Sequence, residues 1–220
     1  ETAGGGLHVL HGSARDEIPR LAARLKVAAV YANRDYEPAA IDRDEAVGHA
    51  LAALGVDFHT RKDHVIFEKG EVLTGAGTLF SVFTPYKNAW LKKLAPFYVK
   101  PYPVQKYASR LAPAPGAMPS LQDLGFERTE SFLKAGMAAG RALFADFKRR
   151  MASYGERRDF PALKGPSYLS VHLRFGTVSI RELAGYAWQH GSEAAGMSGA
   201  GAAIWLSELA WQQALAGGKV

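Results

Sequence analysis

Six prolines fall between Ala95 and Pro119, and they constrain the fold more than any other feature of the sequence. Each proline lacks a backbone N–H and has a fixed φ angle, so neither a helix interior nor a central strand can run through this segment. We therefore expect two structured parts, residues 1–94 and 129–220, joined by a proline-rich linker over residues 95–128.

The first part alternates between apolar runs and segments of helical pattern. Apolar runs at residues 7–10 and 27–32 predict strands, and the second is apolar enough to be covered on both faces. Residues 56–59 are expected to start a third strand. A helix is predicted over residues 42–54, ended by Gly55. Strands alternating with helices across short loops favour a parallel α/β sheet.

The second part has a helical pattern throughout. Apolar residues recur at helical spacing from Thr129 to about Tyr154, which predicts one long helix. Gly136 and Gly140 would weaken this helix unless another helix packs closely against it.

A short helix is predicted from sequence signals at both of its ends. Ser179 and Glu182 form an S-x-x-E capping box, which predicts a helix beginning there. The helix is expected to run to about His190, where Gly191 ends it.

Two groups of residues in the second part carry candidate chemistry. Ser167 and Ser170 offer hydroxyl groups and nearby backbone N–H groups to an anion such as a phosphate. Trp205, Glu208 and Trp211 follow each other at steps of three, which predicts one helical face with a carboxylate between two indoles. Burial of the tryptophans in the core is the competing interpretation, and it is the commoner one for such helices.

The order of these motifs resembles the DNA photolyase/cryptochrome family. The family's Ser-x-Leu-Ser, Leu-x-Phe-Gly-x-x-Ser-x-Arg and Trp-Leu-x-Glu-Leu-x-Trp patterns match residues 167–170, 173–181 and 205–211. Residues 83–91 and 158–161 also look like that family. The resemblance covers nearly the whole chain, whereas the chain does not cover the whole family.

The resemblance implies an α/β part followed by an all-α part. The expected architecture is a partial Rossmann-like parallel sheet, which is the family's antenna domain, followed by the first helices of its FAD-binding domain. We expect the chain to lack the start of the antenna domain and most of the FAD domain. FAD should then be held weakly or not at all, and exposed edges should favour self-association.

The function implied by the resemblance is that of a deoxyribodipyrimidine photo-lyase, a light-driven DNA repair flavoprotein. Reduced FAD would pass an electron to a cyclobutane pyrimidine dimer in DNA. Glu208 would hydrogen-bond the pyrimidine edge and Trp211 would stack on the lesion. The residues expected to line the FAD phosphates are Tyr154, Pro166, Ser167, Tyr168, Leu169 and Ser170.

Other functions stay open at this point. A cryptochrome-type light sensor without repair activity, an inactive remnant and a plain α/β nucleotide binder are the alternatives. Residues 212–215 read Gln-Gln-Ala-Leu where the family continues Arg-(Asp/Glu)-Phe-Tyr, and Pro166 stands where the family often has Thr or Ser. Ala39 and Ala40 cannot hydrogen-bond a pterin, so a folate antenna is disfavoured and the identity of any antenna chromophore is open.

Composition limits the kinds of binding partner and the cellular compartment that we expect for the protein. The net charge of +6 supports a nucleic acid partner without identifying it. The chain has no cysteine and its seven histidines lack ligand spacing, so we expect no metal site. It also has no long apolar run and no signal-peptide pattern, which predicts a cytoplasmic protein with no membrane partner.

Overall fold

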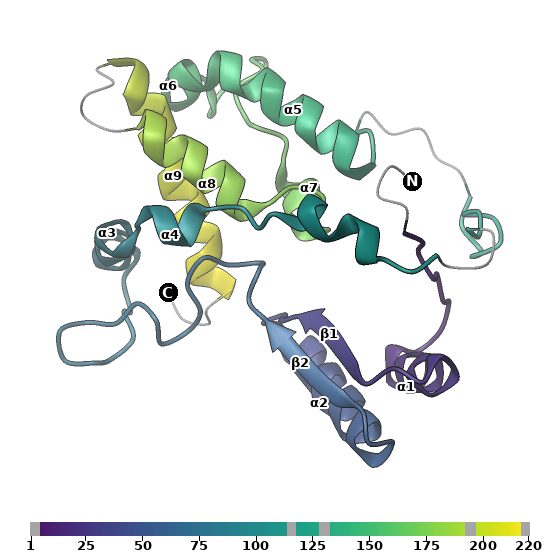
Figure 1. The fold of residues 1–220 in the computed structure, drawn as a ribbon. Helices are drawn as coiled ribbons and strands as arrows, with labels where there is room; N and C mark the ends of the chain where they lie inside the picture. The colour runs from purple at the N-terminus through teal and green to yellow at the C-terminus, as the bar shows by residue number, and fades with distance from the viewer. Residues whose placement is uncertain (1–4, 114–117, 128–132, 192–196, 217–220) are drawn as a thin grey trace. The chain divides into compact units, whose positions relative to one another are not determined.

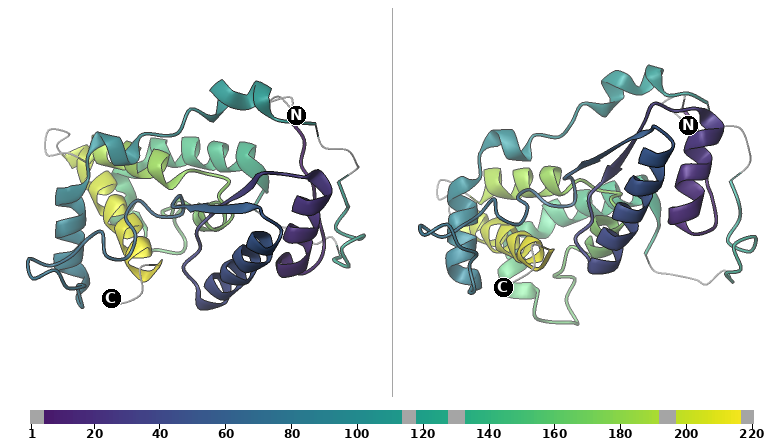
Figure 2. Two further views of the ribbon diagram at one scale, coloured as in Figure 1. Left: turned by 60° about the horizontal axis from the view of Figure 1, so that its bottom comes forward. Right: turned by 90° about the horizontal axis from the view of Figure 1, so that it is seen from below.

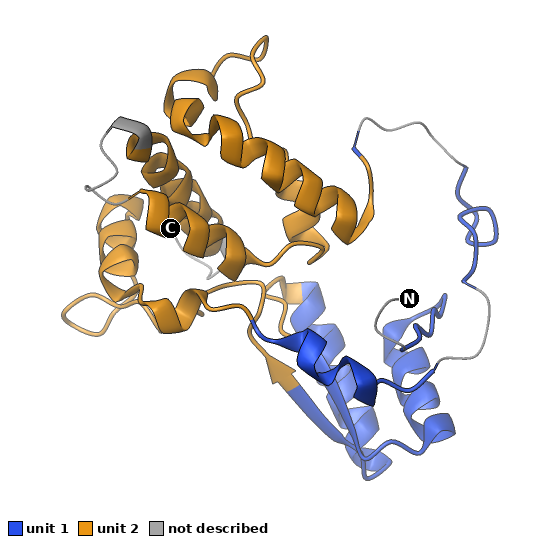
Figure 3. Ribbon diagram, turned by 45° about the horizontal axis from the view of Figure 1, so that its top comes forward, with its two compact units in different colours: residues 1–32, 39–59, 102–133 blue, residues 33–38, 60–101, 134–220 orange. Residues whose placement is uncertain are grey.

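The computed structural model describes residues 5–113, 118–127, 133–191 and 197–216. The chain forms two compact units, each drawn from several stretches of sequence (Figure 3). The first unit comprises residues 1–32, 39–59 and 102–133, and the second comprises residues 33–38, 60–101 and 134–220. The division at residues 95 and 128 that the sequence suggests stays a prediction.

Near the start of the chain two strands form a small parallel sheet (Figure 1). Strands β1 (Ala29–Asn33) and β2 (Asp57–Arg61) pair directly, and helix α2 (Pro38–Ala53) lies between them in the sequence. The pairing runs from the Asp57 N–H, which donates to the Ala28 carbonyl, to the Arg34 N–H, which donates to the Arg61 carbonyl. Both partners advance along the chain together, so the predicted parallel arrangement is confirmed.

Two details of the predicted sheet are wrong. Residues 7–10 form no strand, and the Leu7 side chain is 69% exposed, because this run pairs with no neighbouring strand. Strand β1 is not covered on both faces either, since Tyr31 is 68% exposed and lies against His59. The described sheet therefore has two strands and one open face.

The core of the first unit is formed where its two helices meet. Helix α1 (Ala14–Leu25) contributes Ala22, and α2 contributes Val47 and Leu51, which pack with Val56. Helix α2 starts four residues before the predicted position and is followed by Gly55, whose φ of 71° is the left-handed conformation typical of a helix end.

The second unit is helical. Helices α8 and α9 lie side by side in it (Figure 2). The elements of this unit are α3 (Phe83–Lys93), α4 (Pro96–Val99), α5 (Gly136–Arg150), the 3₁₀ turn η2 (Met151–Ser153), α6 (Tyr154–Arg157), α7 (Ser170–Arg174), α8 (Ile180–His190) and α9 (Met197–Ala216).

The long helix predicted from Thr129 is shorter than expected. Thr129 lies outside the described residues, and α5 begins at Gly136, whose φ of 88° is not helical. A Cβ at Gly140 would lie 2.6 Å from Val178 Cγ1 and 3.0 Å from Nδ1 of His172 in α7, whereas a Cβ at Gly136 would meet nothing within 4 Å. A glycine is therefore needed where α5 meets the segment between α7 and α8.

Two other helix starts can be compared with their sequence signals. Helix α8 has the predicted bounds, with Ser179 as N-cap and Gly191 as C-cap, but the Ser179 side chain makes no capping hydrogen bond. Helix α3 starts at Phe83 with Val82 as N-cap, a residue whose side chain cannot make a capping hydrogen bond.

A buried arginine joins three segments of the second unit. Arg181, at the start of α8, is 4% exposed. Its Nε lies 3.2 Å from an Asp63 carboxylate oxygen, and its Nη1 donates to the Tyr98 carbonyl at 2.8 Å. Its Nη2 donates to the Lys62 carbonyl at 3.3 Å. These bonds fix the start of α8 against the chain that follows β2.

We expect Gly201→Ala to destabilise the second unit by about 1–3 kcal/mol, the usual cost of overpacking. A Cβ at Gly201 of α9 would lie 2.0 Å from the Met151 carbonyl oxygen, so backbone has to move. Urea unfolding followed by circular dichroism measures the effect. Gly75→Ala is the matched control, because a Cβ there meets nothing within 4 Å, and equal stability of the two variants would contradict close packing of α9 on η2.

Candidate functional site

The segment predicted to bind phosphate is held by one buried side chain. Leu169 is fully buried, whereas Ser170, the first residue of α7, is exposed. The Leu169 N–H donates to Ser167 Oγ at 3.4 Å, and Tyr168 has a φ of 58°. The left-handed conformation at Tyr168 turns the backbone sharply between the two serines. Pro166 precedes this turn and is half-buried.

Arg150, at the end of α5, fixes the chain that leads into this segment. Its Nη1 donates to the carbonyls of Lys164 and Gly165, both at 2.8 Å. Its Cζ lies 5.8 Å from the centre of the Tyr168 ring. The Nη2 atom is buried and has no hydrogen-bond partner among the described residues. A buried guanidinium donor left without a partner suits a site for an anionic group.

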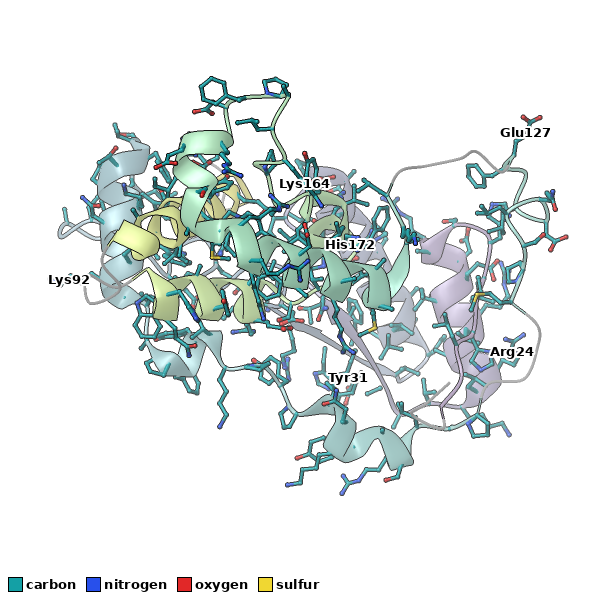
Figure 4. All side chains as sticks on the ribbon, turned by 90° about the horizontal axis from the view of Figure 1, so that it is seen from above. Arg24, Tyr31, Lys92, Glu127, Lys164 and His172 are labelled. Carbon is teal, nitrogen blue, oxygen red and sulfur yellow. The ribbon has the colours of Figure 1, made fainter. Side chains whose placement is uncertain are left out.

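A carboxylate organises the cations next to this segment. Asp146 accepts from Arg150 Nε at 3.1 Å and lies 2.9 Å from Lys164 Nζ (Lys164 is labelled in Figure 4). The hydrogen bonds from Lys164 and Arg150 lower the pKa of Asp146 to about 2. Asp146 is therefore charged at neutral pH and holds both cations in place.

Gly165 brings the predicted phosphate segment against the Arg157–Arg158 backbone. A Cβ at Gly165 would lie 2.3 Å from the Arg157 carbonyl oxygen and 2.8 Å from the Arg158 nitrogen. No side chain fits there without moving the backbone. The contact places residues 166–170 beside the segment that carries Arg158.

Arg158 links two of the predicted site residues. It forms an ion pair and hydrogen bond with Glu208, which raises the pKa of Arg158, and its Cζ lies 5.8 Å from the centre of the Tyr154 ring. Tyr154 is 9% exposed and packs edge-on against Phe147, and burial raises its pKa. The structure thus joins Tyr154 to Glu208 through a guanidinium that sequence reasoning did not assign to the site.

The three residues predicted to share one face of α9 separate into two environments. Trp205 is 3% exposed and lies against Phe147, with ring centres 4.7 Å apart. Trp211 is 38% exposed, and its ring meets the edge of Phe83 at 4.5 Å. The prediction of a single face with two indoles is wrong, because six residues turn a helix by about 600°, which leaves the two side chains about 120° apart around its axis. Glu208 and Trp211, three residues apart, remain neighbours at the surface.

A small hollow in the second unit contains none of the predicted site residues. Gln213 lies in its wall and accepts from the Ile66 N–H at 2.7 Å through Oε1, while its Nε2 is buried without a partner among the described residues. Its lining residues are Phe67, Glu68, Lys69, Gly70, Val72, Leu79, Phe80, Tyr86, Gln213 and Ala214.

The residues around Ser167 fit a phosphate-bearing cofactor in their chemistry. They offer two serine hydroxyl groups, a sharp backbone turn and the Arg150 donor that has no partner in the described part of the chain, and segment 166–170 contains no carboxylate. Across the described ranges, no group of three or more His, Cys, Asp or Glu residues is arranged to hold a metal ion. Within the same ranges, no helix is long and apolar enough to span a membrane.

The fold and the site define a class of protein: a parallel α/β sheet combined with a helical unit that carries a sharp turn between two serines. The family profile described as DNA photolyase matches residues 1–106. An uncharacterised 31.6 kDa protein of Synechococcus sp. strain PCC 6716 is 35% identical over 216 residues, which cover 96% of this chain and 75% of that protein. The chain belongs to the DNA photolyase/cryptochrome family.

Named relatives are longer than this chain. A deoxyribodipyrimidine photo-lyase of Synechococcus sp. strain PCC 6301 is 32% identical, and the match covers 97% of this chain and 46% of the relative. The crystal structure of Synechocystis sp. PCC6803 cryptochrome superposes with a TM-score of 0.76 at 20% identity, covering 96% of this chain and 45% of that structure. The chain therefore spans about half the length of these relatives, and the likeness to the cryptochrome confirms the predicted fold class.

We expect Asp146→Asn to destabilise the protein at neutral pH, and the difference from wild type to shrink as the pH falls. The folded state lowers the pKa of Asp146 to about 2. Its stabilising contribution is therefore complete above about pH 4, the ordinary aspartate range, and is lost as the pH falls towards 2. Thermal unfolding at several pH values between 7 and 2.5 measures this.

The control for this prediction is Asp42→Asn, which removes an exposed carboxylate from α2. A difference between wild type and Asp146→Asn that stays constant down to pH 2.5 would show that the carboxylate charge does not hold Lys164 and Arg150.

Proposed function

We propose that this chain contributes to a light-driven DNA repair flavoprotein that splits cyclobutane pyrimidine dimers, in the cytoplasm. The main observation behind this proposal is that Glu208 and Trp211 of α9 are partly exposed. Trp205, Leu206 and Leu209 of the same helix are buried. Trp211 is not among the buried residues of the core cluster, and its ring lies 4.5 Å from that of Phe83, so the exposed part of the indole is available to a ligand.

In this proposal the turn at residues 166–170 and Tyr154 bind the phosphates of FAD. Ser167 and Ser170 supply hydroxyl groups, and buried Leu169 keeps the turn in place. The Arg150 guanidinium provides the compensating positive charge and holds the carbonyls that precede the turn. Reduced FAD, when bound, supplies the electron that blue light drives to the dimer and that returns after splitting.

The assigned role of Glu208 and Trp211 is to hold the flipped dimer. Trp211 offers an aromatic face for stacking, and the Glu208 carboxylate accepts a hydrogen bond from a pyrimidine edge. Arg158 positions that carboxylate through an ion pair. Since Arg158 also touches Tyr154, the lesion side and the cofactor side of the proposed site share one cation.

The main alternative is a cryptochrome-type light sensor that binds the same cofactor without repairing DNA, and an inactive remnant is the other. A sensor has no need of a carboxylate and an indole presented together at the surface, so the pair on α9 favours repair. An antenna chromophore remains part of the proposal without an assigned identity.

We expect Trp211→Ala to weaken the binding of a dimer-containing oligonucleotide by about fivefold or more, since stacking on an aromatic ring contributes about 1–3 kcal/mol per base. Glu208→Gln should leave binding nearly unchanged and lower the yield of dimer splitting. The protein, expressed from its whole reading frame with excess FAD, is reduced and exposed to blue light, and splitting is measured by chromatography of the bases.

Two controls match these changes. Phe97→Ala removes an exposed aromatic ring from α4, and Glu182→Gln removes an exposed carboxylate from α8. Loss of splitting in the controls as well, or unfolding of Trp211→Ala, would assign the α9 pair to structure. Reversible flavin photoreduction without dimer splitting in the wild type would support the sensor alternative.

A further inference from the structure

One long stretch of this chain contains no acidic residue. Residues 72–122 have no Asp or Glu, although the 220-residue chain has 21 of them. The same stretch carries six cations, Lys87, Lys92, Lys93, Lys100, Lys106 and Arg110. Such a distribution gives the segment a positive charge that no neighbour along the chain offsets.

This stretch contains an exposed 3₁₀ helix, η1 (Val104–Arg110). None of its residues is buried, so the helix contributes nothing to either hydrophobic core. Val104 is 67% exposed and Tyr107 is 46% exposed. An aromatic ring and a large apolar side chain kept in water, without a role in packing, mark a surface available for binding.

Two cations lie on the exposed aromatic ring of this helix. Lys106 Nζ is 5.8 Å and Arg110 Cζ is 5.3 Å from the centre of the Tyr107 ring. Neither cation forms an ion pair with a carboxylate in the described ranges. Positive charge and an aromatic face are thus presented together on one turn.

This combination matches the chemistry of an unpaired nucleic acid strand. Such strands bind where cations follow the phosphates and aromatic rings stack on the bases, and both kinds of group are needed. In a duplex the base faces already stack on one another, so Tyr107 would gain nothing there. An acidic peptide would use the cations and leave the ring unused.

We propose that Lys106, Tyr107 and Arg110 of η1 bind single-stranded nucleic acid, with the two cations on phosphates and the tyrosine stacked on a base. That this strand is DNA and not RNA rests on the proposed repair function, since the bases around a pyrimidine dimer are locally unstacked. The contact itself requires no lesion, light or cofactor, and it is separate from the residues of α9.

Fluorescence anisotropy with labelled oligo(dT) and with an undamaged duplex of equal length tests the proposal on the full chain. Tyr107→Ala weakens oligo(dT) binding by about fivefold or more and leaves duplex binding unchanged. The matched control is Tyr31→Ala, which removes an exposed tyrosine of β1 and changes neither affinity.

The cations are tested through the salt dependence of binding. The double change Lys106→Gln and Arg110→Gln lowers the slope of log affinity against log salt by about 1.4 for oligo(dT), since each phosphate contact to a single strand contributes about 0.7. The double change Arg15→Gln and Arg24→Gln removes two exposed cations of α1 as the control (Arg24 is labelled in Figure 4).

Several outcomes would overturn the proposal. Equal effects of Tyr107→Ala on single strands and duplexes, equal effects of the two double changes on the salt slope, or stronger binding of phosphatidylserine vesicles than of oligo(dT) would each do so. Dimer splitting is measured separately, so a chain that binds oligo(dT) through Tyr107 without splitting dimers would contradict the repair function and leave the strand contact intact.

Discussion

The buried guanidinium of Arg181 is the interaction on which the second unit depends. Its bonds to Asp63 and to the carbonyls of Lys62 and Tyr98 join the start of α8 to chain more than eighty residues earlier. Leaving such a charge buried without its partner costs about 3–5 kcal/mol, which makes other positions of α8 unfavourable. Helix α9 packs along α8, so the placement of α9 follows from the same arginine.

Local signals determine some elements of this fold and fail for others. Ser179 and Gly191 suffice to predict the bounds of α8, because helix ends depend on neighbouring residues. The apolar run at residues 7–10 looks like a strand, yet a strand exists only if a partner strand lies beside it. The exposure of Tyr31 likewise depends on what packs over β1, which the pattern of the strand itself does not contain.

Some residues of the candidate site can likewise be predicted from local sequence patterns, and others cannot. The turn at residues 166–170 and the neighbours Glu208 and Trp211 could be named from motif order and helical spacing. Arg158 could not, because its partner Glu208 lies fifty residues away and no local pattern links them. Trp205 and Trp211 look alike in sequence, and only the positions of Phe147 and Phe83 decide which of the two is buried.

The close approach of Gly165 to the Arg157–Arg158 backbone has a consequence for how this site can change. The turn with the hydroxyl groups and the segment with the guanidinium share one contact surface that has no room for a side chain. Neither segment can be lengthened, shortened or exchanged without altering the other. Any transfer of this turn to another protein must therefore carry residues 154–170 as a single piece.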